Sequence, residues 1–293
     1  MRNAKDLHNY YLKHGNNEGF IVFGDFSKFY DNIQHRKIKT LLYPKIPDDT
    51  HWLLDEILHN MEVDVSYMTD YEFATCMGQK FNSVEYYETV PKNCRTGKKM
   101  MPKSVDIGDQ LSQDIGIFFP HRIDNYVKIV RGVKFYGRYM DDFYFICETK
   151  EEALSILNGI RELCKELGLY LNEAKTHIVK LSANYKYLQI KYTLTATGKV
   201  VRRINPKSVT RERRKLKSYK RLLDKRGIPY ESIKQAYKSW MGDYTKLMSK
   251  AQTKRMKQLY KGLFGENVRW KKLKLYFKTG QKLKRKGTEA AIS

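Results

Sequence analysis

Two adjacent acidic residues interrupt the most strongly apolar part of the chain. Aromatic-rich runs over residues 134–140 and 143–147 are separated only by Asp141 and Asp142. Such runs on either side of a very short gap predict a β-hairpin that carries both acids at its tip. Another short apolar run, residues 20–23, predicts a buried strand that ends at Asp25. Buried strands with acids at their ends predict an α/β (α+β) domain in which a sheet positions the acids.

Helical patterns surround these strands. Before the basic region, the apolar periodicity predicts helices over about residues 36–43, 50–62, 110–127 and 150–167. Pro120 should divide the third of these, and Gly168 should end the fourth. Residues 63–103, rich in Tyr, Gly and turn residues, predict short strands and loops. Residues 185–204 predict another hairpin.

Positive charge is concentrated at the C-terminal end of the chain. The 293 residues carry a formal charge of +24, and residues 202–293 alone hold 29 Lys and Arg against 6 Asp and Glu. A neutral body joined to a strongly basic segment is typical of polyanion binding through counterion release. A surface that is basic only for solubility is the alternative, and an acidic lipid surface is a weaker rival because no lipid-anchor motif accompanies the charge. The basic segment predicts helices over residues 206–227, 230–247 and 249–264, followed by a frayed tail at 266–293.

Several function classes are disfavoured by what the sequence lacks. Its four cysteines lie far apart without a Cys-x-x-Cys pair, which argues against a zinc ribbon or a redox motif. No apolar run is long enough to span a bilayer, and the N-terminus has no signal-like stretch. We therefore expect a cytoplasmic protein whose partner is met in water, with no membrane partner.

The acids need a cation. Asp141 and Asp142 repel each other unless a positive charge neutralises them. Magnesium binds a few carboxylates together with substrate phosphates, and a pair of ions can stabilise the attacking and leaving oxygens of phosphoryl transfer. Asp25, at the end of another buried strand, would complete such a site. An exposed turn is the alternative for an isolated Asp-Asp pair.

Four motifs in order resemble the palm of reverse transcriptases, most closely those of bacteria and retroelements. They are motif A at Asp25–Tyr30, motif B at Ile107–Gln113, motif C at Tyr139–Asp142, and motif D at Gly168–Asn172 with Lys175 and Thr176. Four matches in family order are far more specific than one short motif. The resemblance implies a right-hand polymerase palm with reduced fingers over residues 1–201, a basic helical thumb over 202–265 and a flexible basic tail over 266–293.

The same resemblance implies the site. Asp25, Asp141 and Asp142 would hold two Mg²⁺ ions, for which Mn²⁺ can substitute, and Lys175 would protonate the leaving pyrophosphate. Backbone amides of Phe26, Ser27, Lys28 and Phe29 would face the triphosphate of a deoxynucleotide. Tyr30 would select against a 2′-hydroxyl, with a core tyrosine as its alternative role. The remaining nucleotide-binding residues would be Ile107, Gly108 and Gln113.

The nucleic-acid contacts implied by the resemblance lie in two places. Template RNA and a DNA or RNA primer would lie between palm and thumb. On the palm side the predicted contacts are Tyr139, Met140, Tyr187 and Leu188, and on the thumb side they are Arg202, Arg203, Arg211, Arg213 and Arg214. Residues 187–189 stand where the family has an aromatic-Leu-Gly primer grip, but Gln189 replaces the glycine.

Motif B favours one subgroup. Ile107-Gly108 followed by Ser112-Gln113 is similar to the enzymes of diversity-generating retroelements, whose copying is error-prone. An alkyl side chain in place of an amide removes a hydrogen-bond anchor beside the incoming nucleotide. Retron-type and defence-associated reverse transcriptases are the alternatives, since residues 197–201 are a loose match to a retron signature. A group II intron maturase fits less well, because no zinc-binding tail follows the thumb.

The N-terminal region is short for the family. Only 24 residues precede Asp25, so the chain is either truncated or relies on Arg2, Lys5 or an accessory protein to hold the triphosphate. An alternative of another class is therefore a catalytically impaired nucleic-acid-binding or assembly protein. The intact set of three acids argues for the enzyme.

Overall fold

The computed structural model describes residues 2–108, 110–225, 227–266 and 268. The chain divides into two compact units. Unit 1 comprises residues 2–187 and 191–201, and unit 2 comprises residues 188–190 together with the described residues from 202 onward. All but two residues of the predicted tail, 266–293, lie outside the described residues. In the part of the chain that the structure covers, no helix has both the length and the apolar character needed to cross a bilayer.

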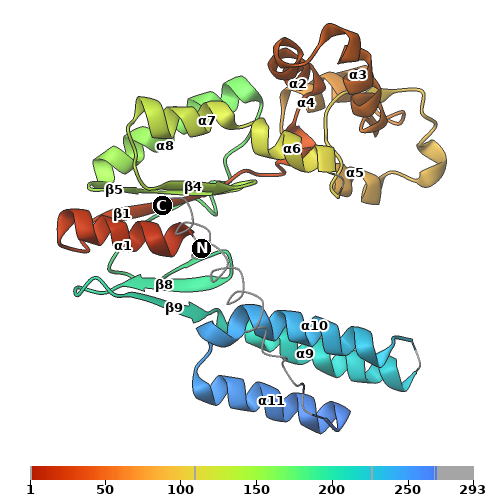
Figure 1. Cartoon of the computed structure of the whole chain (residues 1–293). Coiled ribbons are helices and arrows are strands. Elements are labelled where there is room, and N and C mark those ends of the chain that lie inside the picture. Colours follow the sequence, from red (N-terminus) through yellow and green to blue (C-terminus); the bar gives the residue numbers. More distant parts are fainter. Residues whose placement is uncertain (1, 109, 226, 267, 269–293) are drawn as a thin grey trace, which may run out of the picture. The chain divides into compact units, whose positions relative to one another are not determined.

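A four-stranded sheet organises unit 1 (Figure 1). Its strands are β1 (Phe20–Asp25), β4 (Tyr136–Tyr139), β5 (Asp142–Cys147) and β6 (His177–Lys180), in the order β4-β5-β1-β6. The pairs are antiparallel, and the predicted β4–β5 hairpin and β1 strand are confirmed. The register places Asp25, the last residue of β1, opposite Asp142, the first residue of β5. The sheet therefore brings residues 117 positions apart in sequence to one edge.

Helices cover both faces of this sheet (Figure 1). On one face lies α8 (Lys150–Leu167), which begins at Thr149, whose hydroxyl accepts a bond from the Glu152 amide, and ends at Gly168 in the left-handed conformation. On the other face lies α1 (Arg2–His14), where Asp6 accepts a 2.6 Å hydrogen bond from the Tyr144 hydroxyl. Because side chains alternate along a strand, β5 sends Phe143 and Phe145 toward α8 and Tyr144 toward α1.

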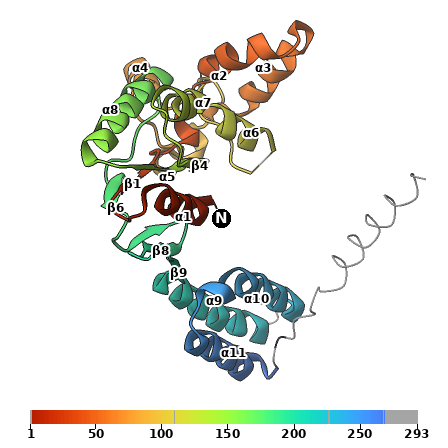
Figure 2. The same ribbon diagram turned by 60° about the vertical axis from the view of Figure 1, so that its left-hand side comes forward.

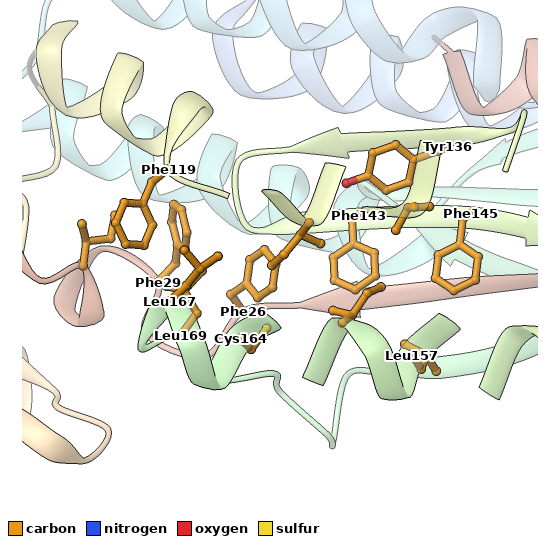
Figure 3. Close-up of a cluster of buried hydrophobic side chains, with 14 of the residues drawn as sticks. Phe26, Phe29, Phe119, Tyr136, Phe143, Phe145, Leu157, Cys164, Leu167 and Leu169 are labelled. Atoms are coloured by element: carbon orange, nitrogen blue, oxygen red, sulfur yellow. The ribbon is translucent and has the colours of Figure 1, made fainter. Parts of the chain in front are cut away.

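The main core lies between the sheet and α8 (Figure 3). Phe143 and Phe145 of β5 and Phe26, which follows β1, meet Leu157 and Cys164 of the helix, and all are at most 3% exposed. At roughly 1.5–3 kcal/mol for each large apolar side chain, this burial is a main source of the stability of unit 1. The edge that carries the three acids is thus mounted on a rigid, close-packed layer.

The chain between β1 and β4 forms the second part of unit 1. Its helices are α2 (His35–Leu42), α3 (His51–Asn60), α4 (Asp70–Gly78), α5 (Ser83–Thr89), α6 (Gln110–Phe118) and α7 (His121–Asn125), and a π-helical turn, Tyr126–Val130, continues α7. The short strands β2 (Val63–Asp64) and β3 (Met100–Met101) pair with each other. Pro120 separates α6 from α7, as predicted. The prediction of strands and loops alone over 63–103 was wrong, because α4 and α5 form there.

Residues 185–204 form three strands where one hairpin was predicted. They are β7 (Tyr185–Tyr187), β8 (Ile190–Leu194) and β9 (Val200–Ile204), in that order in the sheet. The two residues between β7 and β8, Leu188 and Gln189, both have positive φ angles, 44° and 65°. This is the backbone of a tight two-residue hairpin turn, so the turn forms even though Gln189 replaces glycine.

Unit 2 is a helical module (Figure 2). Its helices are α9 (Pro206–Asp224), α10 (Tyr230–Tyr244) and α11 (Lys250–Phe264), close to the predicted ranges. Leu216 of α9, Tyr237 of α10 and Tyr260 of α11 meet in a small core, where the two tyrosine rings stack 4.3 Å apart. Asn205 begins α9 by accepting a hydrogen bond from the Lys207 amide.

Candidate active site

The three acids meet at the edge of the sheet. Asp25 and Asp142 are opposite each other in the β1–β5 ladder, and the Asp141 carbonyl accepts a 3.2 Å hydrogen bond from the Phe26 amide. Met140, just before the acids, has a φ of 55°, which turns the hairpin sharply between its strands. The hairpin therefore holds Asp141 and Asp142 beside the end of β1 by its backbone.

The charges of these acids disfavour one another. Burial raises the pKa of Asp142 to about 6, and the neighbouring charges of Asp141 and Asp25 add to the effect. Burial also raises the pKa of Asp141, with a further contribution from Asp25. Carboxyl groups that resist ionisation together are stabilised when a cation joins them.

One cation from the chain already contacts this cluster. The Lys175 ammonium lies 3.1 and 2.9 Å from the two carboxylate oxygens of Asp25, and the Asn172 side chain donates a 3.0 Å hydrogen bond to the second oxygen. The hydrogen bond to Asp25 raises the pKa of Lys175. The backbone holds this loop in place, because the Asn172 amide donates to the Asp25 carbonyl at 2.7 Å.

The donor set suits a hard divalent cation, since it consists of carboxylate oxygens beside a cavity that can admit phosphates. Within residues 2–108, 110–225, 227–266 and 268, however, no cluster of three or more His, Cys, Asp or Glu side chains is close enough to hold a metal as it stands. The Asp25 oxygens are taken up by Lys175 and Asn172. The oxygen donors of the acids suit Mg²⁺ chemically, and in this structure the positive charge beside Asp25 is the Lys175 ammonium.

A cavity of about 570 Å³ opens beside these acids. Its lining residues are Asp25, Phe26, Ser27, Lys28, Phe29, Tyr30, Asp31, Ser83, Val84, Ser104, Val105, Asp106, Ile107, Asp141, Asn172 and Lys175. Most of the predicted catalytic and nucleotide-binding residues are thus brought together. The side chains of Phe26 and Phe29 point into the core and are at most 3% exposed, so these two residues line the cavity mainly with their backbone. Of the four amides predicted to face a triphosphate, those of Phe26 and Ser27 are already bonded within the chain, to the carbonyls of Asp141 and Tyr170.

The backbone of motif A curves around the cavity. Lys28 has a φ of 49°, and Phe29 follows in the right-handed helical region. Left-handed and right-handed residues in succession turn neighbouring N–H groups toward one side and favour anions there. The Asn32 side chain holds this bend by donating to the Lys28 carbonyl at 2.8 Å.

Tyr30 stands at the wall of the cavity against α6. A side chain on Gly116 would place its Cβ 2.8 Å from the Tyr30 hydroxyl, so only glycine leaves room for the ring. Burial raises the pKa of Tyr30, and the nearby charge of Asp141 adds to it. The ring is therefore kept neutral and close to the acids.

Some predicted residues lie outside the lining. Among the described residues, Gly108, Gln113 and Asp142 do not line the cavity, although Asp142 adjoins it through Asp25. Gly108 has a φ of 132°, which requires glycine, and Asp109 after it lies outside the described residues. Tyr139 is 64% exposed and Met140 half-buried beside the acids, whereas Tyr187 is buried against Phe23 and Tyr144.

The remaining predicted contacts belong to unit 2. Leu188 is in its first segment, and the five arginines Arg202, Arg203, Arg211, Arg213 and Arg214 are exposed on β9 and α9. Arg213 also lines a groove of about 370 Å³ between α9 and α11 with Arg255. Exposed positive charge of this kind attracts a polyanion.

Several residues at the cavity were missed from the sequence. Ser83 of α5 donates a 2.6 Å hydrogen bond to Asp31, and both line the cavity together with Ser104, Asp106 and Asn172. For Asn172 a local signal existed, because it lies within motif D. For Ser83 and Ser104 none did, because they reach the site through contacts with residues far away in sequence.

The chain is similar to known proteins. The family model described as reverse transcriptase (RNA-dependent DNA polymerase) matches residues 1–192. A solved structure of apo telomerase from Candida tropicalis is 14% identical, with a TM-score of 0.42, over 67% of this chain and 35% of that one. Telomerase from Candida albicans, in complex with a fragment of telomeric RNA, is 12% identical, with a TM-score of 0.45, over 91% and 43%.

The chain thus spans less than half the length of these telomerase chains. No curated protein matches its sequence. The family match covers more than half of the chain, including the sheet, the three acids and the cavity. The chain therefore belongs to the reverse transcriptase (RNA-dependent DNA polymerase) family.

Proposed function

We propose that this chain copies an RNA template into DNA by two-metal nucleotidyl transfer. The observation that carries the proposal is the meeting of Asp25, Asp141 and Asp142 at one sheet edge, beside a cavity lined by motif A and Lys175. In this assignment unit 1 is the palm with reduced fingers, and unit 2 is the thumb. The substrates are deoxynucleoside triphosphates, an RNA template and a DNA or RNA primer.

Asp25, Asp141 and Asp142 would hold two Mg²⁺ ions, which supply positive charge to the reacting phosphate and lower the pKa of the primer hydroxyl. The curved backbone of residues 28–30 faces the triphosphate through its amides, whereas the Phe26 and Ser27 amides donate to the carbonyls of Asp141 and Tyr170. Tyr30 closes the sugar side of the cavity and so favours deoxynucleotides.

Lys175 is the proton donor of this scheme. Its ammonium contacts Asp25, which would be a Mg²⁺ ligand, and once released from that carboxylate it would reach the pyrophosphate as a general acid. A lysine ammonium away from Asp25 is still protonated at neutral pH, so it carries the proton that the leaving group needs.

The subgroup proposal depends on Ile107. Its side chain is 82% exposed at the cavity, where a glutamine amide would offer hydrogen bonds to the incoming nucleotide. Error-prone copying, as in diversity-generating retroelements, follows if this anchor is missing. Restoring it with Ile107→Gln should lower misincorporation opposite template adenines. Equal error spectra in the two proteins would contradict the subgroup.

Primer extension tests the main proposal. The purified chain is given a mixed-sequence RNA template, a primer, deoxynucleotides and Mg²⁺, and the products are sequenced. We expect extension that Asp141→Asn and Asp142→Asn each reduce at least about 100-fold, since each removes a metal ligand. Tight binding of template and primer without extension, even with an accessory protein added, would indicate a nucleic-acid-binding descendant.

A further inference from the structure

A strained residue forms one wall of the nucleotide cavity. Ser104 has a φ of 102°, a backbone conformation that residues other than glycine rarely adopt. It is 6% exposed and begins the segment Ser104–Ile107, which lines the cavity. Such strain persists only where surrounding contacts impose it.

A buried histidine contacts Ser104. The Nε2 atom of His35 lies 2.6 Å from the Ser104 carbonyl oxygen, and the His35 side chain is buried at 2% exposure. A carbonyl only accepts hydrogen bonds, so Nε2 carries the hydrogen. The backbone supports the same contact, because the His35 amide donates to Pro102 at 3.1 Å and the Ser104 amide to Ile33 at 3.0 Å.

The strained turn at Ser104 is connected both to motif A and to the wall of the cavity. The Val105 amide, next to Ser104, donates a 3.1 Å hydrogen bond to the carbonyl of Tyr30, so the turn also places motif A. Asp106 and Ile107 follow directly on the cavity wall. A shift at Ser104 would therefore move the wall of the cavity and Tyr30 together.

We propose that His35 is a positioning residue for the incoming nucleotide. It holds Ser104 in its strained conformation and so sets the width of the cavity between Tyr30 and Ile107. The inference rests on the proposed polymerase function, because the cavity is taken as the nucleotide site.

A pair of substitutions at His35 separates its hydrogen bond from its bulk. The Nε2 atom of glutamine is as many bonds from Cα as Nε2 of histidine, so His35→Gln keeps a donor that can reach the Ser104 carbonyl. His35→Leu fills similar space without a donor. We expect His35→Leu to raise the KM for deoxynucleotides about tenfold, the size expected for one buried hydrogen bond, with kcat and primer-template affinity within about twofold. His35→Gln should stay within about threefold of the wild type.

Substitutions at Ser104 test the same link from its other end. Glycine adopts a φ of 102° without strain. Adding Ser104→Gly to His35→Leu should therefore lower the raised KM for deoxynucleotides at least about threefold. Ser104→Val, with a branched side chain that resists positive φ, should raise the KM even with His35 in place. If His35→Leu fails to fold, this variant still tests whether the backbone conformation of Ser104 sets the KM.

The measurements are steady-state extension at varied deoxynucleotide concentration, primer-template binding and thermal melting for every variant. A lower melting temperature with an unchanged KM in His35→Leu and Ser104→Val would overturn the role of His35 and leave the polymerase intact. Absence of Mg²⁺-dependent extension by the wild type would instead refute the proposed function.

Discussion

At the scale of single residues, the most informative contact is the ion pair between Lys175 and Asp25. Both carboxylate oxygens of Asp25 face the ammonium at 3.1 and 2.9 Å, although the Lys175 side chain is 63% exposed and free to swing away. The same carboxylate is the expected metal ligand on β1. If Asp25 binds the metal, lysine and metal compete for this carboxylate, and the competition can be measured without any turnover.

Replacing Lys175 should strengthen metal binding while weakening catalysis. Lys175→Met removes the competing cation, so we expect Mn²⁺, followed by electron paramagnetic resonance, to bind several-fold more tightly. Extension should slow at least about 100-fold, because the proton donor is lost. Lys180→Met, at the exposed end of β6, is the matched control and should change neither. Unaltered Mn²⁺ affinity in Lys175→Met would show that the ion pair does not block the site.

The buried side chain of Lys103 should make the stability of the fold depend on pH. Its side chain is fully buried, and its ammonium donates to the carbonyls of Cys76 and Gln79 at 2.9 and 2.6 Å. Burial lowers the pKa of Lys103 to about 8 in the folded chain, whereas an unfolded lysine titrates near about 10.4. Between these pH values the unfolded chain binds more protons, so the contribution of Lys103 to stability rises with pH.

Urea unfolding at pH 7 to 10 measures this effect. The free energy of unfolding of the wild type should rise relative to that of Lys103→Met from about pH 8 upward. Below pH 8 the difference between the two proteins should be flat. Lys98→Met, an exposed neighbour, should run parallel to the wild type. A difference that falls with pH would contradict a lowered pKa.

The residues predicted from the sequence are those whose chemistry is local. Asp25, Asp141 and Asp142 stand at ends of apolar runs, so periodicity placed them at strand ends, and the resemblance of four ordered motifs favoured a metal site over an exposed turn. His35 and Ser104 could not be predicted in the same way. Their hydrogen bond joins residues 69 positions apart, and neither type is unusual in a helix start or a loop. The positive φ angle of Ser104 arises only in the folded backbone, so the sequence gives no sign of it.

At the scale of elements, one arginine connects the hairpin to the helices before it. The Arg138 guanidinium forms a forked ion pair with Asp124 of α7, at 2.9 and 2.7 Å, and is 7% exposed. It also donates to the carbonyl of Met140 at 2.9 Å and to that of Ile117 in α6 at 2.6 Å. The turn that carries the two acids is therefore tied to α6 and α7 by one side chain.

Substituting this arginine should cost both stability and activity. Arg138→Lys keeps the charge but cannot form the fork, so we expect a loss of about 2–4 kcal/mol in the free energy of unfolding. Activity at a temperature where the variant is folded should fall as well, because Met140 precedes the acids. Arg122→Lys is the matched control. Its ion pair with Glu166 is half-exposed, and its loss should cost at most about 1 kcal/mol by urea unfolding. Equal costs for the two variants would contradict the role of Arg138.

The elements predicted correctly are those with a strong apolar stripe or a clear cap. The helix α8 has both, since it buries Ile156, Ile160 and Cys164 and lies between Thr149 and Gly168. The helices α4 and α5 have no fully buried residue, so periodicity gave no signal over 63–103. Their N-caps, Thr69 and Asn82, were present as local signals. At Gln189 a local signal was misleading instead of missing. The residue is unfavourable in a tight turn, but the pairing of β7 with β8 forms the turn nevertheless.

At the scale of the whole molecule, charge and fold divide at nearly the same place. The charge is close to neutral up to residue 201 and strongly positive after it, and the boundary between the two compact units falls there as well. Charge concentrated on one helical unit attracts the phosphate backbone without reading bases. Sequence specificity, if the chain has any, must then come from base pairing or from unit 1.

The salt dependence of binding tests this division. Affinity for a primer-template duplex should fall steeply between 50 and 200 mM salt, because each neutralised phosphate releases counterions. The double substitution Arg213→Gln and Arg214→Gln, both exposed on α9, should reduce the slope of log K against log salt by about 1 to 2, at roughly 0.7–0.9 per lost phosphate contact. Lys150→Gln, an exposed lysine at the start of α8, loses charge in unit 1 and should leave the slope unchanged. If the slope of the α9 variant equals that of the wild type while the Lys150 variant lowers it, the phosphate contacts belong to unit 1, and the basic unit must bind something else.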